Sequence, residues 1–407
     1  MTKKSDAPAI RFKGFSDAWE QRKLGELVDR VVRKNTNNES TLPLTISAQY
    51  GLVDQITYFN NRVASRDVSN YYLVLNGEFA YNKSTSDGYP FGAVKRLDLY
   101  EKGVLSTLYI VFAPKKEQQI DSDYLTVFFD TDRWHKGVAE RAAEGARNHG
   151  LLNISAEDFF DIDLSVPKDI VEQKQIGAFI RQLDNLITLH QRKFEKLTNV
   201  KKSMLEKMFP QNGSSYPEIR FKGFTDPWEQ RKLGEIGSVS MCRRIFKEQT
   251  SETGDIPFYK IGTFGADPDA FISRELFEEY KSKYPYPQKG DILISASGSI
   301  GRTVEFAGNN EYFQDSNIVW LNHDERLSNP FLKCFYSVVK WAGIEGSTIK
   351  RLYNDNILNT VICMPSVPEQ KRIGLFFENL DNLITLHQRE LEKLQNIKKS
   401  MLEKMFV

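Results

Sequence analysis

Residues 175–209 read QIGAFIRQLDNLITLHQRKFEKLTNVKKSMLEKMF, and residues 372–406 read RIGLFFENLDNLITLHQRELEKLQNIKKSMLEKMF. Each near copy places apolar side chains in alternating steps of four and three, which is the period of a helix whose seam packs on another helix. We predict two helices, each roughly 50 Å long at 1.5 Å per residue, that pair as an antiparallel coiled coil. The seam residues are Ile176, Ile180, Leu183, Ile187, His190, Phe194 and Leu197 in the first copy, and Ile373, Phe377, Leu380, Ile384, His387, Leu391 and Leu394 in the second.

Polar residues interrupt this seam at equivalent points. His190 matches His387, and Lys201 matches Lys398. A histidine can bind a metal or titrate near neutral pH, so a metal site or a pH switch is one interpretation. A polar residue in a coiled-coil seam also fixes register and orientation, and we favour that role.

A second repeat opens each half of the chain. Residues 8–27 read PAIRFKGFSDAWEQRKLGEL, and residues 217–236 read PEIRFKGFTDPWEQRKLGEI. The spacing of Asp17 and Glu20 resembles a capping box, and a glycine eight residues after the aspartate suits a helix end. We predict a short helix in each copy, with Trp19 and Trp228 as packing anchors.

The segments between the repeats differ in sequence but keep their landmarks in the same order. PLTISAQYG at 43–51 matches PFYKIGTFG at 257–265, and GEFAY at 77–81 matches GDILI at 290–294. A turn followed by β-branched and aromatic residues indicates a strand. The two inserts, 28–160 and 237–358, are therefore expected to share one fold and to present two different surfaces.

These observations predict an α+β protein with two mixed α/β domains, related by pseudo-twofold symmetry and joined by two long helices. We expect the segments 1–27 (first frame), 28–165 (first domain), 166–210 (central helix), 211–236 (second frame), 237–364 (second domain) and 365–407 (C-terminal helix).

Composition sets broad limits on function. The chain has 407 residues, with 55 basic and 54 acidic side chains, so net charge alone does not indicate nucleic acid. Three well-separated cysteines predict neither a disulfide framework nor a zinc site. The polar start and the lack of a long apolar run predict no signal peptide and no membrane span, and hence a cytoplasmic protein.

Polar loops follow the predicted strands in both inserts. Hydroxyls and amides suit phosphate oxygens, and Lys, Arg and Asn suit base edges, although such loops are also ordinary turns. The DNA-binding candidates are Tyr50, Lys83, Ser84, Thr85, Ser86, Tyr89, Arg147, Asn148 and His149 in the first insert, and Lys260, Thr263, Phe264, Ser295, Ser297, Ser299, Arg302, Lys350, Arg351 and Asn354 in the second.

Enzyme signatures are weak. There is no phosphate-binding loop, no HExxH motif and no paired Cys/His set, so we predict no catalytic residue and no metal site. Asp269, Glu279 and Lys281 imitate a nuclease metal site, but they occur in one insert only. A metal-dependent nuclease and a coiled-coil adaptor that binds only protein remain the alternatives.

The whole arrangement resembles the specificity subunit of type I restriction-modification systems. The most informative residues are KGDILIS at 289–295 with Gly301, and PSVPEQKRI at 365–373. The first copy of the second motif departs slightly, as PKDIVEQK at 167–174.

This resemblance implies two target-recognition domains, each of which reads one half of a split, asymmetric site in double-stranded DNA, and helices that set the unread spacer. It implies docking of two methyltransferase subunits, which use S-adenosylmethionine to methylate adenine N6, and of restriction subunits, which use ATP and Mg²⁺. By the same resemblance, the chain itself binds no cofactor and is not an enzyme.

Overall fold

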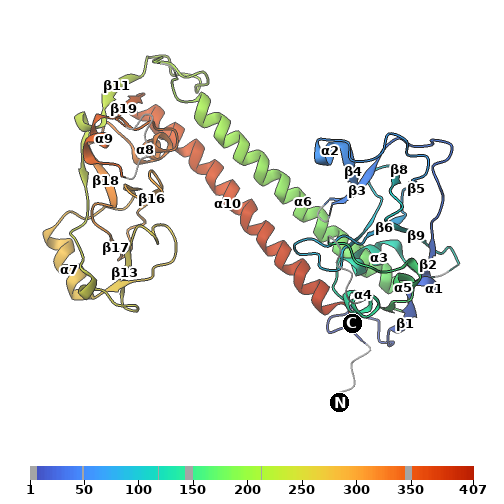
Figure 1. Ribbon diagram of the computed structural model, residues 1–407. Helices are drawn as coiled ribbons and strands as arrows, with labels where there is room; N and C mark the ends of the chain where they lie inside the picture. Colours follow the sequence, from blue (N-terminus) through green and yellow to red (C-terminus); the bar gives the residue numbers. More distant parts are fainter. Residues whose placement is uncertain (1–6, 48–49, 118, 143–149, 212, 344–350) are drawn as a thin grey trace. The chain divides into compact units, whose positions relative to one another are not determined.

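The structure is a computed structural model that describes residues 7–407 apart from 48–49, 118, 143–149, 212 and 344–350. The chain divides into two compact units (Figure 1). Unit 1 is Met1–Gln191 with Arg389–Val407, and unit 2 is Arg192–Gln388. Each unit contains one mixed domain, the start of one long helix and the end of the other. This content confirms the predicted α+β class.

Unit 1 contains short strands and helices. Its main sheet has the order β2-β9-β6-β7, and all of its strand pairs are antiparallel. The strands are β1 (Glu20–Lys23), β2 (Val28–Arg30), β3 (Leu44–Ser47), β4 (Gly51–Asp54), β5 (Tyr72–Leu75), β6 (Phe79–Asn82), β7 (Ala93–Arg96), β8 (Lys102–Leu105), β9 (Ile110–Pro114) and β10 (Asp163–Val166). The short helices are α1 (Leu24–Leu27), α2 (Gln55–Phe59), α3 (Ser122–Phe129), α4 (His135–Arg141) and α5 (Ala156–Phe160).

Unit 2 repeats the main sheet with the order β12-β18-β15-β16. A three-stranded sheet, β14-β13-β17, includes a parallel pair between β13 and β17. The strands are β11 (Glu229–Lys232), β12 (Gly237–Ser240), β13 (Ile256–Tyr259), β14 (Phe271–Ile272), β15 (Ile292–Ser295), β16 (Thr303–Glu305), β17 (Tyr312–Phe313), β18 (Ile318–His323) and β19 (Val361–Met364). The helices are α7 (Arg274–Lys283), α8 (Asn329–Tyr336) and α9 (Asn354–Asn359), with 3-10 turns at Leu233–Glu235 and Lys247–Gln249.

The shared landmarks of the two inserts form equivalent strands. The segments after Gly77 and Gly290 are β6 and β15, the second strand from one edge of each main sheet. The matching segments 43–51 and 257–265 contain β3 and most of β13, respectively. Two inserts of low similarity therefore form one fold, as predicted.

The prediction of a short helix in each frame is wrong. Residues Glu20–Lys23 and Glu229–Lys232 are strands, and only the next three or four residues turn helically. Each strand pairs antiparallel with the strand that precedes a long helix, β10 or β19. This distant partner supplies the backbone hydrogen bonds that a local helix would have supplied.

The long helices are α6 (Ile170–Lys207) and α10 (Val367–Lys404). All the predicted seam residues are buried or half-buried. In unit 1 the ammonium group of Lys398 on α10 donates to Asp184 on α6 at 2.6 Å, and in unit 2 Lys201 on α6 pairs with Asp381 on α10. The start of one helix thus faces the end of the other in each unit, which confirms the antiparallel pairing. The seam lysines form ion pairs across it, as a register-fixing role requires.

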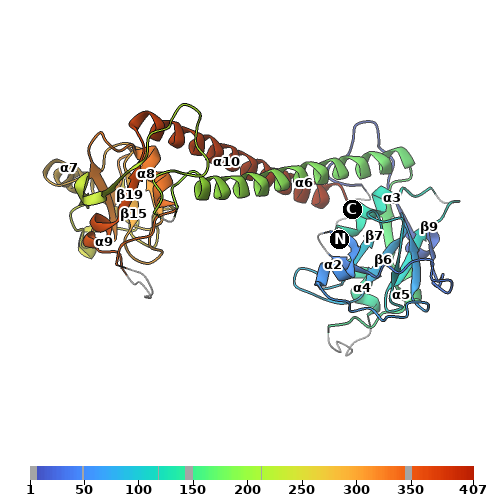
Figure 2. The same cartoon turned by 90° about the horizontal axis from the view of Figure 1, so that it is seen from above.

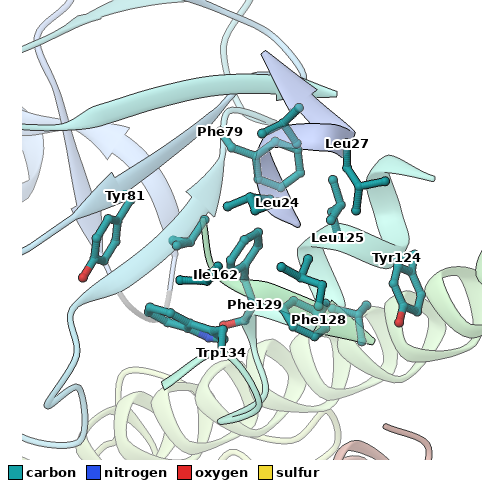
Figure 3. Packing of buried hydrophobic residues seen from close by; sticks show 14 of the residues in the cluster. Leu24, Leu27, Phe79, Tyr81, Tyr124, Leu125, Phe128, Phe129, Trp134 and Ile162 are labelled. Carbon is teal, nitrogen blue, oxygen red and sulfur yellow. The ribbon is translucent and has the colours of Figure 1, made fainter. Parts of the chain in front are cut away.

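The core of unit 1 joins the frame, the sheet and both long helices. Leu24 and Leu27 from α1 meet Phe79 from β6 and side chains of α3 (Figure 3). Helix α3 lies between the sheet and α6 (Figure 2), and Met405 and Phe406 from the end of the chain complete the cluster. Unit 2 has the equivalent cluster, which Met208 and Phe209 complete.

Candidate nucleic-acid interface

In unit 1 the candidate site is the loop that follows β6. Ser84 forms an isolated β-bridge with Leu151, and the Leu152 amide donates to the Lys83 carbonyl at 3.0 Å. Both the amide and the hydroxyl of Thr85 donate to the Gly150 carbonyl, at 2.6 and 3.0 Å. The loop is therefore held against the chain that follows residues 143–149, and Ser84 itself remains exposed.

In unit 2 the loop that follows β15 has the same anchorage. Ser297 forms an isolated bridge with Arg351, and the Leu352 amide donates to the Ala296 carbonyl at 2.7 Å. The Ser297 hydroxyl also donates to the Asn317 side-chain oxygen at 2.8 Å. The loop therefore contacts both the chain that follows residues 344–350 and the residue just before β18.

The two loops are held by the same pattern of backbone contacts, but the side chains at the bridge differ. The bridge pairs Ser84 with Leu151 in unit 1 and Ser297 with Arg351 in unit 2. Leucine presents an apolar surface and arginine presents a cation with five N–H donors. The same backbone arrangement therefore carries an apolar side chain in one unit and a cationic side chain in the other.

Arginines of unit 2 are held in place by backbone carbonyls. One nitrogen of Arg351 donates to the Ser316 carbonyl at 2.9 Å, and one nitrogen of Arg302 donates to the Gly265 carbonyl at 3.2 Å. Ser316 has a φ of 53°, a conformation that costs energy for a residue with a side chain and that clusters at functional sites. Because each contact uses one N–H, the remaining donors of both guanidinium groups can face a ligand.

The structure places other candidates less favourably. Phe264 is 1% exposed and belongs to a core cluster of unit 2, so the expectation of an aromatic side chain at a loop tip is wrong for this residue. Ser295 is also buried, and its hydroxyl donates to the Ser299 carbonyl. Lys260 forms an ion pair with Asp269 at 2.9 Å, and Thr263 bonds back to the Lys260 backbone.

Several other candidates are exposed or half-buried, and four lie outside the residues that the structure describes. Ser86 is exposed, Tyr89 is half-buried, and Asn354 is the exposed first residue of α9. Tyr50 is also exposed. Arg147, Asn148, His149 and Lys350 lie outside the described residues. Tyr353, which is not among the predicted residues, is 64% exposed beside the Arg351 guanidinium and joins the candidates.

The chemistry of a metal-dependent nuclease finds no support in the described residues. Asp269 forms an ion pair with Lys260, and the Lys281 ammonium lies over the rings of Phe277 and Tyr286. Within the described part of the chain, no group of three or more His, Cys, Asp or Glu side chains is arranged to hold a metal ion.

The cysteines are unsuited to act as nucleophiles. Burial raises the pKa of the Cys242 and Cys334 thiols to about 12, and burial also raises the pKa of Cys363. The thiolate is the nucleophilic form, so these groups are protonated at neutral pH.

Comparison with known proteins identifies the family. The family model for the type I restriction modification DNA specificity domain matches twice, over residues 16–199 and 225–396. The chain belongs to this family. The two matches correspond to the two repeats, so each half of the chain is one specificity domain.

Individual relatives agree with this assignment. A protein assigned as a type I restriction enzyme specificity subunit of Haemophilus influenzae is 61% identical over 158 residues, which is 38% of this chain and 41% of that relative. The match thus spans less than half the length of that relative. A type I restriction enzyme specificity subunit of Methanocaldococcus jannaschii is 23% identical over 85% of this chain and 82% of its own.

The fold is also known. The crystal structure of the type I restriction-modification system S subunit from M. genitalium has a TM-score of 0.61 at 16% identity, covering 98% of this chain and 99% of that one. Among the residues described here, no helix is long and apolar enough to cross a membrane.

Proposed function

We propose that each recognition domain binds one half of a bipartite, asymmetric site in double-stranded DNA. The observation that carries this proposal is the equivalent loop anchorage after β6 and β15, which presents Leu151 in one domain and Arg351 in the other. Base edges in the major groove are distinguished by apolar contacts and by donor and acceptor patterns. Two domains with one backbone arrangement and different side chains would therefore select different bases.

The proposal includes two copies of a methyltransferase subunit as partners. Support comes from the duplicated surfaces of the long helices: Leu186 and Leu189 on α6 and the equivalent Leu383 and Leu386 on α10 are all 43–52% exposed. Identical surfaces on a repeated scaffold suit identical partners. Those subunits would transfer the methyl group of S-adenosylmethionine to adenine N6.

Restriction subunits that use ATP and Mg²⁺ would join the same cytoplasmic complex. In this proposal the chain contributes recognition and assembly, and the chemistry belongs to the partners.

Exchanging one insert tests the proposal. Residues 28–160 are replaced by the first insert of another family member, and methylated adenines are mapped in cells that carry the complete complex. We expect one half of the bipartite motif to change and the other half to stay. The reciprocal exchange of residues 237–358 is the control and should change the opposite half. A change in both halves after either exchange would contradict the proposal.

A further inference from the structure

A buried ion pair stands at the start of each long helix. Arg11 in the first frame donates two hydrogen bonds to Glu172 on α6, at 2.6 and 2.8 Å. Arg220 in the second frame donates two to Glu369 on α10, both at 2.8 Å. Both glutamate side chains are 1% exposed. The long helices are thus attached to their frames by the same two-pronged contact.

The next residue on each helix is a glutamine with three hydrogen bonds. Gln173 accepts from the Asp121 amide at 2.8 Å, and donates to the carbonyls of Pro167 and Gln119 at 2.9 and 3.2 Å. Asp121 is the N-cap of α3. The glutamine therefore ties the first turn of α6 to the start of α3.

Gln370 makes the equivalent bonds in unit 2. It accepts from the amide of Ser328, the N-cap of α8, at 2.9 Å. It donates to the carbonyls of Arg326 and Pro365 at 2.9 and 3.0 Å. Both glutamines are 1% exposed, so these bonds are shielded from water.

A glycine lets the helices approach closely one turn later. A Cβ atom on Gly177 would lie 2.9 Å from the Cβ of Asp123 and from the Tyr124 amide, and a Cβ on Gly374 would lie 2.4 Å from the Cβ of Pro330. Neither glycine has an unusual backbone conformation, so close packing explains both. The long helix and the first turn of α3 or α8 therefore form a fixed crossing.

The main sheet connects this crossing with the loops of the candidate interface. Helix α3 packs on β7, which pairs with β6, and α8 packs on β15. The loops that anchor Ser84 and Ser297 follow directly from β6 and β15. A continuous series of contacts therefore links each long helix to a loop, through α3 or α8 and the main sheet.

We infer that these residues form a positioning joint: Arg11, Glu172, Gln173 and Gly177 in unit 1, and Arg220, Glu369, Gln370 and Gly374 in unit 2. The joint sets the angle between each recognition domain and its helix, and thereby the permitted spacer, while the loops select the bases. A buried ion pair stabilises a fold less than apolar packing of the same volume. A duplicated ion pair with a fully bonded glutamine is therefore better explained by orientation than by stability.

The inference rests on the proposed DNA recognition, and it is tested in the complete complex with the methyltransferase subunits. Gln173→Met, Gln370→Met and the double variant keep side-chain length and remove the three hydrogen bonds. Methyl transfer is measured on duplexes that carry the native half-sites with the native spacer, or with a spacer one base pair shorter or longer. A second set keeps the native spacer and changes single bases. Gln175→Met, at an exposed position two residues further along α6, is the matched control.

We expect each joint variant to lose about tenfold in its preference for the native spacer and to keep its base preference. The control should keep both preferences. A purely structural role would lower methylation equally at all spacers, and an unchanged spacer preference would overturn the inference.

Two further outcomes are decisive. If Gln173→Met does not assemble, Arg11→Lys keeps the charge but removes the two-pronged contact, and it should lower the spacer preference by a smaller factor; an unchanged preference would overturn the inference. If the unmodified complex methylates no bipartite site, the proposed function itself fails and the inference fails with it.

Discussion

At the scale of single residues, three carboxylates that are buried or half-buried have defined cationic partners. Glu172 and Glu369 each form an ion pair with an arginine of a frame, and Asp130 forms ion pairs with two lysines. Removing one partner of a buried pair leaves an uncompensated charge, which is strongly destabilising.

The Arg11→Ala variant tests this effect. Glu172 would be left with no cation in a site where its side chain is 1% exposed, and we expect the free energy of unfolding of unit 1 to fall by about 3 kcal/mol. Urea denaturation measures the loss. Arg22→Ala is the control, because its partners Glu20 and Glu26 are exposed and such pairs contribute little. Equal losses in the two variants would contradict the argument.

The pH dependence of stability should depend on Asp130. Burial alone would raise the pKa of this carboxyl, but the ammonium groups of Lys95 and Lys398 more than offset burial and lower the pKa below 3.8. A lowered pKa stabilises the folded state above pH 3.8, and this contribution is lost as the pH falls through the folded-state pKa.

We therefore expect Asp130→Asn to be less stable than the unmodified chain by about 1–2 kcal/mol at pH 7, with the difference shrinking below pH 4. Urea midpoints at pH 7, 5 and 3 measure it. Asp132→Asn removes a carboxylate that is 80% exposed and should show no such trend. A constant difference across the three pH values would count against the ion pairs.

At the scale of elements, the phenylalanine that follows each long helix packs against a frame tryptophan and against the short helix α3 or α8. The ring of Phe406 contacts Trp19 and Tyr124, and the ring of Phe209 contacts Trp228 and Phe331. The Nε1 atoms of both tryptophans are buried and have no hydrogen-bond partner in the described residues. The tryptophans are therefore packing anchors, as their position in the frame repeat predicts.

Truncating one of these aromatic ends should destabilise the unit that receives it. Phe406→Ala removes a ring that is 3% exposed, and we expect a loss of about 3–5 kcal/mol. Thermal and urea denaturation measure it. Leu386→Ala, at a position that is 52% exposed on α10, the helix that precedes Phe406, should change stability by less than about 0.5 kcal/mol. A small effect of Phe406→Ala would show that the contact is dispensable.

At the scale of the whole molecule, the proposed function links the length of the paired helices to the spacer between half-sites. One heptad added to the middle of both α6 and α10 keeps the seam in phase, since seven residues are two turns of a 3.5-residue period. It lengthens each helix by about 10 Å, or about three base pairs of DNA.

We expect an active complex with these two insertions to methylate a site whose spacer is about three base pairs longer, with unchanged half-sites. Mapping of methylated adenines measures this. Inserting two residues in each helix is the control: the seam would rotate out of register, so assembly should fail. An active heptad variant with the native spacer would contradict the role of the helices as a ruler.

Features that depend on neighbours in sequence were predictable. The seam of α6 and α10, the equivalence of the inserts and the strands β6 and β15 all follow from local periodicity and turn residues. The two repeats also supplied an internal comparison, because a pattern present twice is easier to recognise than one present once.

Features that depend on distant partners were not. Residues Glu20–Lys23 are a strand because β10, more than a hundred residues away, pairs with them. Phe264 lies in the core although its loop is polar, and Lys260 is held by Asp269.

The sequence by itself determined that this protein has two similar recognition domains on a repeated helical scaffold, because repeats and helical periods are written in consecutive residues. Only the tertiary structure decided how each domain is attached to its helix. The bonds of Glu172 and Gln173 reach Arg11, Asp121 and Gln119, and such contacts arise only when the folded chain brings these segments together.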